Sequence, residues 1–164
     1  MAGRGLICVS VAAEHGDAVL AAVAPVVDLV DVIEIRMDAL RDPDLAHCIA
    51  ALPIPVLVTN RPTWEGGQFA GSEEDRIDSL CQALQAGARY ADIELAAAPE
   101  LRARLLIMAK QCKARVIVSR HDFEATPGVA ELQSTLAEMQ ASGADIGKIV
   151  VTATSPADAL RILA

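Results

Sequence analysis

The stretches VIVSRHDFEATP (residues 116–127) and DIGKIVV (residues 145–151) decide which fold this sequence is expected to adopt. Each contains an apolar run of strand length with one polar residue that stands out: His121 follows the first run and Lys148 interrupts the second. A polar side chain in a buried strand costs free energy unless it is paired or has a function. We therefore expect two parallel strands with His121 and Lys148 facing each other at one end of the sheet, an arrangement suited to carbonyl chemistry.

The same alternation extends over the whole chain and predicts six βα units in a single domain, residues 1–164. The expected strands cover residues 6–11, 30–37, 55–59, 90–95, 115–119 and 145–152. The expected helices cover residues 17–27, 43–51, 73–86, 99–112, 128–142 and 156–163. The sequence is 53% apolar but has only four aromatic residues, which is typical of parallel strands of Val, Leu, Ile and Ala covered by helices.

Consecutive βα units leave two fold families open, a doubly wound open sheet and a barrel. Nucleotide-binding doubly wound sheets carry a glycine-rich turn after the first strand, and residues 9–14 (VSVAAE) contain no glycine. Polar residues instead occur at the ends of most strands: Ser10, Glu34, Arg36, Asn60, Arg61, Asp92, Glu94, His121 and Lys148. Functional groups at many strand ends are typical of a (β/α)8 barrel. We therefore expect an α/β fold of the (β/α)8 TIM-barrel type, incomplete, with six βα units.

The composition excludes several classes of partner. The formal net charge is −8, and no run of Lys or Arg exceeds two residues, which argues against nucleic-acid binding. No apolar stretch approaches the roughly 18 residues that span a membrane. The four cysteines lack the close spacing of a zinc or redox site and are expected to be reduced thiols. We expect a cytoplasmic protein without a metal site.

Two residue groups allow a functional and a structural interpretation. Lys148 in an apolar strand would lose hydration, which favours the neutral, nucleophilic amine that forms Schiff bases with ketones. Alternatively, its side chain reaches from the strand end to water. Glu34 and Arg36 fall on one strand face by the period-two rule and would either contact a ligand or form an internal ion pair. Histidine titrates near neutral pH, so His121 suits a group that takes a proton and later returns it.

Four segments together resemble the type I 3-dehydroquinate dehydratase family: residues 34–38 (EIRMD), 59–67 (TNRPTWEGG), 119–127 (SRHDFEATP) and 143–149 (GADIGKI). The resemblance implies a barrel in which Lys148 forms a Schiff base with the C3 ketone of 3-dehydroquinate. It also implies that His121 acts as general base and then acid, and that Glu65 orients this histidine. The implied substrate-binding residues are Ser10, Glu34, Arg36 and Arg61. No metal or organic cofactor is implied, because the iminium serves as the electron sink.

A complete barrel of this kind needs roughly 200 to 250 residues. The resemblance therefore implies that the seventh and eighth units are missing, together with an arginine that pairs with the substrate carboxylate. We expect exposed edges on the first and sixth strands and a homo-oligomer, a dimer, that covers the open side. The expected function is dehydration of 3-dehydroquinate, with activity impaired by the missing units. The alternative is a non-catalytic remnant or an oligomeric binding protein derived from such an enzyme.

Overall fold

Six parallel strands form one sheet in the computed structural model of the protein, which describes residues 4–41 and 45–163. The strands are β1 (Cys8–Val11), β2 (Val32–Arg36), β3 (Val56–Thr59), β4 (Tyr90–Glu94), β5 (Arg115–Asp122) and β6 (Ile146–Val151). They lie side by side in chain order, and every neighbouring pair is parallel. A doubly wound sheet would reverse its strand order at a switch point. The uninterrupted order confirms the barrel type, with six of its units.

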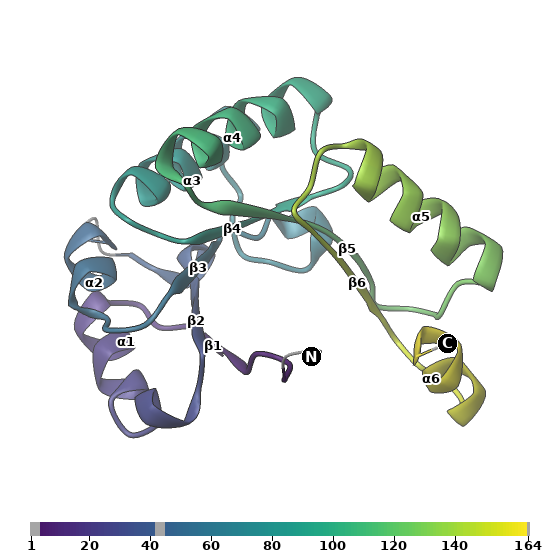
Figure 1. The fold of residues 1–164 in the computed structure, drawn as a ribbon, viewed down its shortest axis with the longest axis horizontal. Coiled ribbons are helices and arrows are strands. Elements are labelled where there is room, and N and C mark those ends of the chain that lie inside the picture. Colours follow the sequence, from purple (N-terminus) through teal and green to yellow (C-terminus); the bar gives the residue numbers. More distant parts are fainter. Residues whose placement is uncertain (1–3, 42–44, 164) are drawn as a thin grey trace.

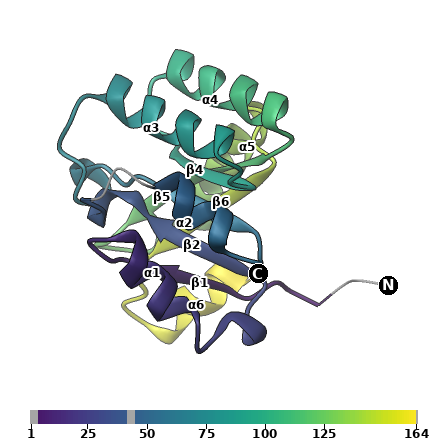
Figure 2. The same ribbon diagram turned by 90° about the vertical axis from the view of Figure 1, so that its left-hand side faces the viewer.

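Each of the six strands is followed by a helix, and the first five helices lie on one face of the sheet (Figure 1). The six helices are α1 (Gly16–Val23), α2 (Leu45–Ala51), α3 (Glu73–Gln85), α4 (Pro99–Cys112), α5 (Val129–Ala141) and α6 (Pro156–Leu163). The sheet curves as an arch with α1 to α5 on its convex side, and β1 and β6 lie at opposite ends of the arch (Figure 1). Figure 2 shows the arch from the side of α1 and α2. The protein is therefore a half-barrel, open on its concave side.

The main core lies between the strands and these helices. It is formed by strand residues of one parity and by the inner faces of α3 and α4: Ile33, Ile35, Val58, Ile93, Val118, Ile77, Leu80 and Leu105 are among its members. The opposite parity faces the concave side, where Val32, Leu57 and Ile117 form a small apolar layer. Two residues further along each of these strands the side chains become polar. The apolar layer thus supports a polar site at the carboxyl ends of the strands.

The expected elements are confirmed, and their boundaries differ by more than two residues in two places. β5 continues three residues beyond residue 119 because it pairs with β6 as far as Asp122 and Val151. α1 ends at Val23, four residues before the expected end. The expected start of the second helix falls on residues 42–44, which lie outside the described ranges. Within those ranges, no helix is long and apolar enough to cross a membrane.

Candidate functional site

A small pocket of about 190 Å³ opens on the concave side at the carboxyl ends of the strands. Its lining includes six of the seven predicted site residues: Glu34, Arg36, Arg61, Glu65, His121 and Lys148. Ser10 is exposed on β1, where it is in register with Glu34, and does not line the pocket. Residues from β2, β5, β6 and the loop after β3 therefore meet at one place, as expected for a barrel mouth.

Lys148 is held by a buried carboxylate. Its Nζ lies 3.2 Å from Oδ2 of Asp92, whose side chain is fully buried, while the Lys148 side chain remains 32% exposed. The other oxygen of Asp92 accepts hydrogen bonds from Ser119 Oγ (2.6 Å) and Arg61 Nη2 (2.8 Å). Lys148 is thus neither dehydrated among apolar side chains nor free in water. Its ammonium form is ion-paired, and the proton must leave before the amine can attack a carbonyl.

His121 is oriented by Glu65. Nδ1 of His121 lies 3.1 Å from Oε2 of Glu65, and Nη1 of Arg61 lies 3.3 Å from the same oxygen. Because Oε2 of Glu65 already accepts a hydrogen bond from Arg61, we assign the donor role in the contact with His121 to Nδ1, which then carries the hydrogen. Nε2 is then left with a lone pair and can act as a base. Phe123 stacks on the histidine, with ring centroids 5.9 Å apart and an interplanar angle of 18°.

Arg61 contacts both the Lys148–Asp92 pair and the His121–Glu65 pair through their carboxylates. Its side chain is 5% exposed and forms salt bridges with Glu65, with Asp92 and, at 2.5 Å, with Glu94. The second oxygen of Glu94 lies 2.5 Å from Nη1 of Arg76, a fully buried arginine of α3. Burial raises the pKa of Glu94 to about 7, although the two arginines act in the opposite direction. Arg61 lines the pocket, but its guanidinium is engaged with three carboxylates.

The sequence-based expectations did not include Asp92, Glu94 and Arg76 among the site residues. Asp92 and Glu94 are two residues apart on β4 and are both fully buried. This is the same period-two spacing of charges that pointed to Glu34 and Arg36. The spacing of Asp92 and Glu94 could therefore have identified both as candidate site residues. Arg76 gave no comparable signal, because it lies within an ordinary amphipathic helix.

The charged residues of β2 have internal partners. Arg36 donates two hydrogen bonds to Asp38, from Nε at 2.8 Å and from Nη2 at 2.6 Å. Burial tends to raise the pKa of Asp38, but the bonds and charge of Arg36 more than compensate and lower it. Glu34 accepts a hydrogen bond of 2.6 Å from Thr59 Oγ1. The internal ion pair considered for this strand is present, and Arg36 keeps 27% of its side chain exposed toward the pocket side.

In residues 4–41 and 45–163, no three His, Cys, Asp or Glu side chains are arranged to hold a metal ion. The four cysteines, Cys8, Cys48, Cys81 and Cys112, are free thiols. The pocket lining itself offers a lysine amine, an imidazole and the carboxylates of Glu34 and Glu65.

Comparison with known proteins identifies relatives of the whole chain. The family model for type I 3-dehydroquinase matches residues 7–164. The 3-dehydroquinate dehydratase of Desulfotalea psychrophila is 45% identical over 132 residues, which cover 80% of this chain and 58% of that protein. The bifunctional 3-dehydroquinate dehydratase/shikimate dehydrogenase of Arabidopsis thaliana is 41% identical over 162 residues, 96% of this chain and 27% of that protein. The chain thus spans about 58% or less of the length of these two relatives.

Solved structures agree in fold. The type I 3-dehydroquinate dehydratase from Clostridium difficile, with covalent modified comenic acid, superposes with a TM-score of 0.91 at 28% identity, covering 98% of this chain and 68% of that chain. The 3-dehydroquinate dehydratase from Enterococcus faecalis gives a TM-score of 0.89 at 30% identity, with 98% and 72% covered. Because the family model spans nearly the full sequence and the fold matches, this chain belongs to the type I 3-dehydroquinase family.

Proposed function

We propose that this chain carries the catalytic residues of a 3-dehydroquinate dehydratase, a hydro-lyase of the shikimate pathway that forms 3-dehydroshikimate through a Schiff base on Lys148. The observation that carries the proposal is the meeting of Lys148, His121 and Glu65 at one pocket. Membership in the family supplies the reaction. Lys148, which is ion-paired with Asp92, would supply the nucleophilic amine, and His121, which contacts Glu65, would transfer the proton.

The first step is condensation at Lys148. Once its Nζ has given up a proton, the amine attacks the C3 carbonyl, and loss of water yields an iminium. Asp92 is the nearest carboxylate to Nζ and is positioned to hold the positive charge of the amine before the reaction and of the iminium after it. The iminium then acts as the electron sink, so no metal or organic cofactor is needed.

The second step is proton transfer by His121. Its Nε2 takes a proton from C2, and the electrons move into the iminium to give an enamine. The same imidazolium then protonates the leaving C1 hydroxyl, which departs as water. Glu65 keeps the ring in one tautomer and stabilises the imidazolium between these events. Hydrolysis of the product iminium releases 3-dehydroshikimate and restores Lys148.

The remaining predicted residues differ in how far they are free to contact a substrate. Arg36 is partly exposed and can donate to a substrate oxygen while keeping one bond to Asp38. Glu34 and Ser10 face the same side of the sheet and can bind hydroxyl groups. Arg61 is almost fully engaged internally, so we propose that it acts mainly by holding Glu65 and Asp92 in place.

A turnover assay tests the proposed activity. The chain is incubated with 3-dehydroquinate, and 3-dehydroshikimate is followed through the ultraviolet absorbance of its conjugated enone. We expect measurable turnover that is lost in Lys148→Met and retained in Lys110→Met, a matched control because Lys110 is exposed on α4. Absence of turnover in the unaltered chain, under conditions in which a full-length relative reacts, would favour the alternative of a non-catalytic binding protein.

We also propose that residues 1–164 act as one cytoplasmic domain and that a second copy covers the open side as a homodimer. β1 and β6 are sheet edges in the described structure. Large apolar side chains are exposed near them: Leu6 (65%) before β1, and Leu160 (68%) and Leu163 (82%) on α6. Such surfaces favour association. Light scattering coupled to gel filtration is expected to give twice the chain mass, and a stable monomer at low micromolar concentration would contradict this proposal.

A further inference from the structure

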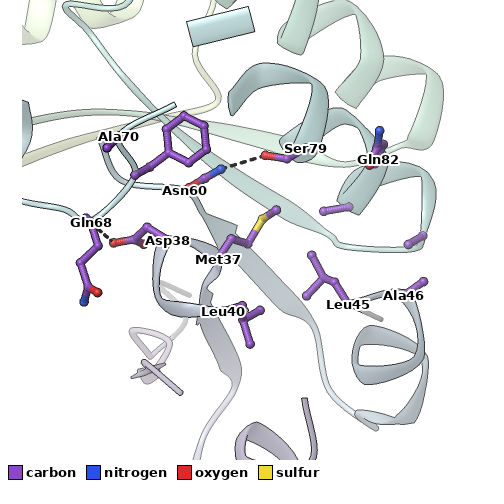
Figure 3. Close-up of a pocket in the computed structure, with 13 residues that line it drawn as sticks. Met37, Asp38, Leu40, Leu45, Ala46, Asn60, Gln68, Ala70, Ser79 and Gln82 are labelled. Carbon is purple, nitrogen blue, oxygen red and sulfur yellow. Dashed lines mark hydrogen bonds between the residues drawn. The ribbon is translucent and has the colours of Figure 1, made fainter. Parts of the chain in front are cut away.

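The side chain of Asp38 is fully buried next to the candidate active site, but the proposed mechanism makes no use of it. Asp38 follows β2 in a short 3₁₀ turn, Met37–Ala39, and it is not among the residues that line the pocket at the mouth. Figure 3 shows Asp38 and Gln68 in the wall of a larger pocket of about 480 Å³ outside the mouth. Burying a carboxylate costs free energy unless it is paired. The partners of Asp38 therefore indicate what this residue does.

Arg36 is the first partner of Asp38. Nε of Arg36 donates to Oδ1 at 2.8 Å, and Nη2 donates to Oδ2 at 2.6 Å. This pairing uses one edge of the planar guanidinium and fixes its orientation, so Nη1 lies on the opposite edge, away from Asp38. Arg36 lines the pocket at the mouth. Asp38 thus determines which edge of Arg36 a substrate can meet.

The second partner is the loop that carries Glu65. Oδ2 of Asp38 also accepts a hydrogen bond from the backbone N–H of Gln68 at 3.1 Å, which is drawn as a dashed line in Figure 3. Burial alone would raise the pKa of Asp38, but the bonds and charge of Arg36 lower it. The backbone N–H groups of Gln68 and Arg61 lower this pKa further. The carboxylate therefore holds both ends of the loop to the end of β2.

The loop is one compact unit. Phe69 N–H donates to the carbonyl of Arg61 at 3.0 Å, and Thr63 N–H donates to the carbonyl of Phe69 at 3.0 Å. The Arg61 side chain holds this unit to β4, so Asp38 supplies a separate contact to β2. Glu65 lies within the unit and contacts His121. A shift of the loop relative to β2 would therefore move Glu65 and change how it orients His121.

We propose that Asp38 is a positioning residue for the reaction: it fixes the edge of Arg36 that meets the substrate, and it holds the loop with Glu65 to β2. This inference rests on the proposed dehydratase function, which gives Arg36 and Glu65 their roles. Loss of Asp38 should therefore weaken substrate binding through Arg36 and slow proton transfer through Glu65. Kinetic measurements can separate these two effects.

Steady-state kinetics with 3-dehydroquinate provide the first test. Asp38→Asn keeps the size of the side chain but removes its charge and one acceptor oxygen. We expect KM to rise and kcat to fall by about tenfold each, the effect of one lost charge-assisted hydrogen bond. Arg36→Met should raise KM at least as much but lower kcat less. The double variant should have the KM of Arg36→Met and the kcat of Asp38→Asn.

A change on the loop side isolates the contact with Gln68. Gln68→Pro removes the N–H that Asp38 accepts and leaves the pair with Arg36 intact, so kcat should fall while KM stays nearly constant. Gln68→Ala keeps this N–H and should behave like the unaltered chain, because the Gln68 side chain is exposed. Gln68→Pro also tests the proposal if Asp38→Asn does not fold.

Asp31→Asn is the matched control for Asp38→Asn. Asp31 also accepts from one arginine, Arg4 at 2.6 Å, and from one backbone N–H, that of Ile7 at 2.8 Å. It precedes β2, however, and therefore lies at the opposite end of that strand from Asp38. Asp31→Asn should leave both KM and kcat unchanged.

A measurement without substrate separates this inference from the proposed function. The imidazole Hε1 signal of His121, assigned by comparison with His121→Asn, is recorded by NMR. We expect this signal to shift in Asp38→Asn and Gln68→Pro and to stay in place in Asp31→Asn. A chain that shows no turnover but keeps this dependence would refute the dehydratase function and support the positioning role of Asp38.

Three results would overturn the proposal. The first is a His121 signal in Asp38→Asn that matches the unaltered chain. The second is a KM of the double variant that multiplies the two single increases, because Asp38 and Arg36 would then act separately. The third is a kcat of Gln68→Pro equal to that of Gln68→Ala.

Discussion

Replacing Arg61 with methionine should lower the free energy of unfolding by about 3–5 kcal/mol, the cost of leaving buried charges without their partner. Arg61 is 4% exposed and bonds to Glu65, Asp92 and Glu94 at distances between 2.5 and 3.3 Å. Methionine has a similar length and fills the space, so packing changes little and the loss reports mainly on charge. The assay is urea unfolding at pH 7.5, followed by circular dichroism.

A surface arginine provides the matched control. Arg104 also contacts two carboxylates, Glu74 at 3.0 Å and Asp78, but its side chain is 40% exposed. Exposed ion pairs contribute about 0–1 kcal/mol, so Arg104→Met should cost no more than that. Arg61→Lys should fall between the two, because an ammonium keeps the charge but cannot reproduce the planar fork of a guanidinium. Equal costs for Arg61→Met and Arg104→Met would refute the role of Arg61 as the common partner of three buried carboxylates.

Three further outcomes are expected. His121→Asn should lower kcat by about 10²- to 10⁴-fold while the chain still forms a reducible adduct with 3-dehydroquinate; loss of the adduct would place His121 in the condensation step as well. Burial raises the pKa of Glu94 from its usual 4.5 to about 7. Between these pH values the folded protein keeps a proton that the unfolded chain loses, so the free energy of unfolding should fall by about 3 kcal/mol as the pH rises from 4.5 to 7. Urea titrations of Glu94→Gln should lack this fall, whereas the exposed control Glu138→Gln should keep it, and parallel pH profiles for both variants would contradict the assignment. Gly67→Ala should lower both the Tm and kcat, because a Cβ at this position would collide with the carbonyl of Arg61. Gly5→Ala is the control and should leave both unchanged, because Gly5 has open space around it. An unchanged Tm in Gly67→Ala would contradict the prediction, since the loop would then adjust to the added methyl group.

The fold could be predicted because its signals are local. Each strand is a short apolar run, and the alternation of side chains along a strand fixes which residues face the mouth. The same rule put Glu34 and Arg36 on one face of their strand, and both line the pocket at the mouth. The extra length of β5 could not be read from the sequence, since residues 120–122 are polar and form strand only through pairing with β6.

The electrostatic partners of the site could not be predicted, because they join residues far apart in the chain. Lys148 and Asp92 are separated by 56 positions, and no local pattern shows that a carboxylate lies 3.2 Å from the amine. The sequence left open whether the Lys148 side chain loses hydration or reaches water, and in the structure it is 32% exposed beside Asp92. Arg61 was expected to face a ligand, but its guanidinium is bound by three carboxylates, one from its own loop and two from β4. Such assignments depend on tertiary structure.

Borohydride reduction in the presence of 3-dehydroquinate tests the central role of Lys148 most directly. The chain is incubated with both reagents, its mass is measured, and the modified residue is mapped by peptide mass spectrometry, with a full-length relative as a positive control. The proposed mechanism predicts a ligand-sized mass gain on Lys148 that is absent in Lys148→Met and unaffected in Lys110→Met. An unmodified chain beside a modified control, or an adduct on another lysine, would contradict it.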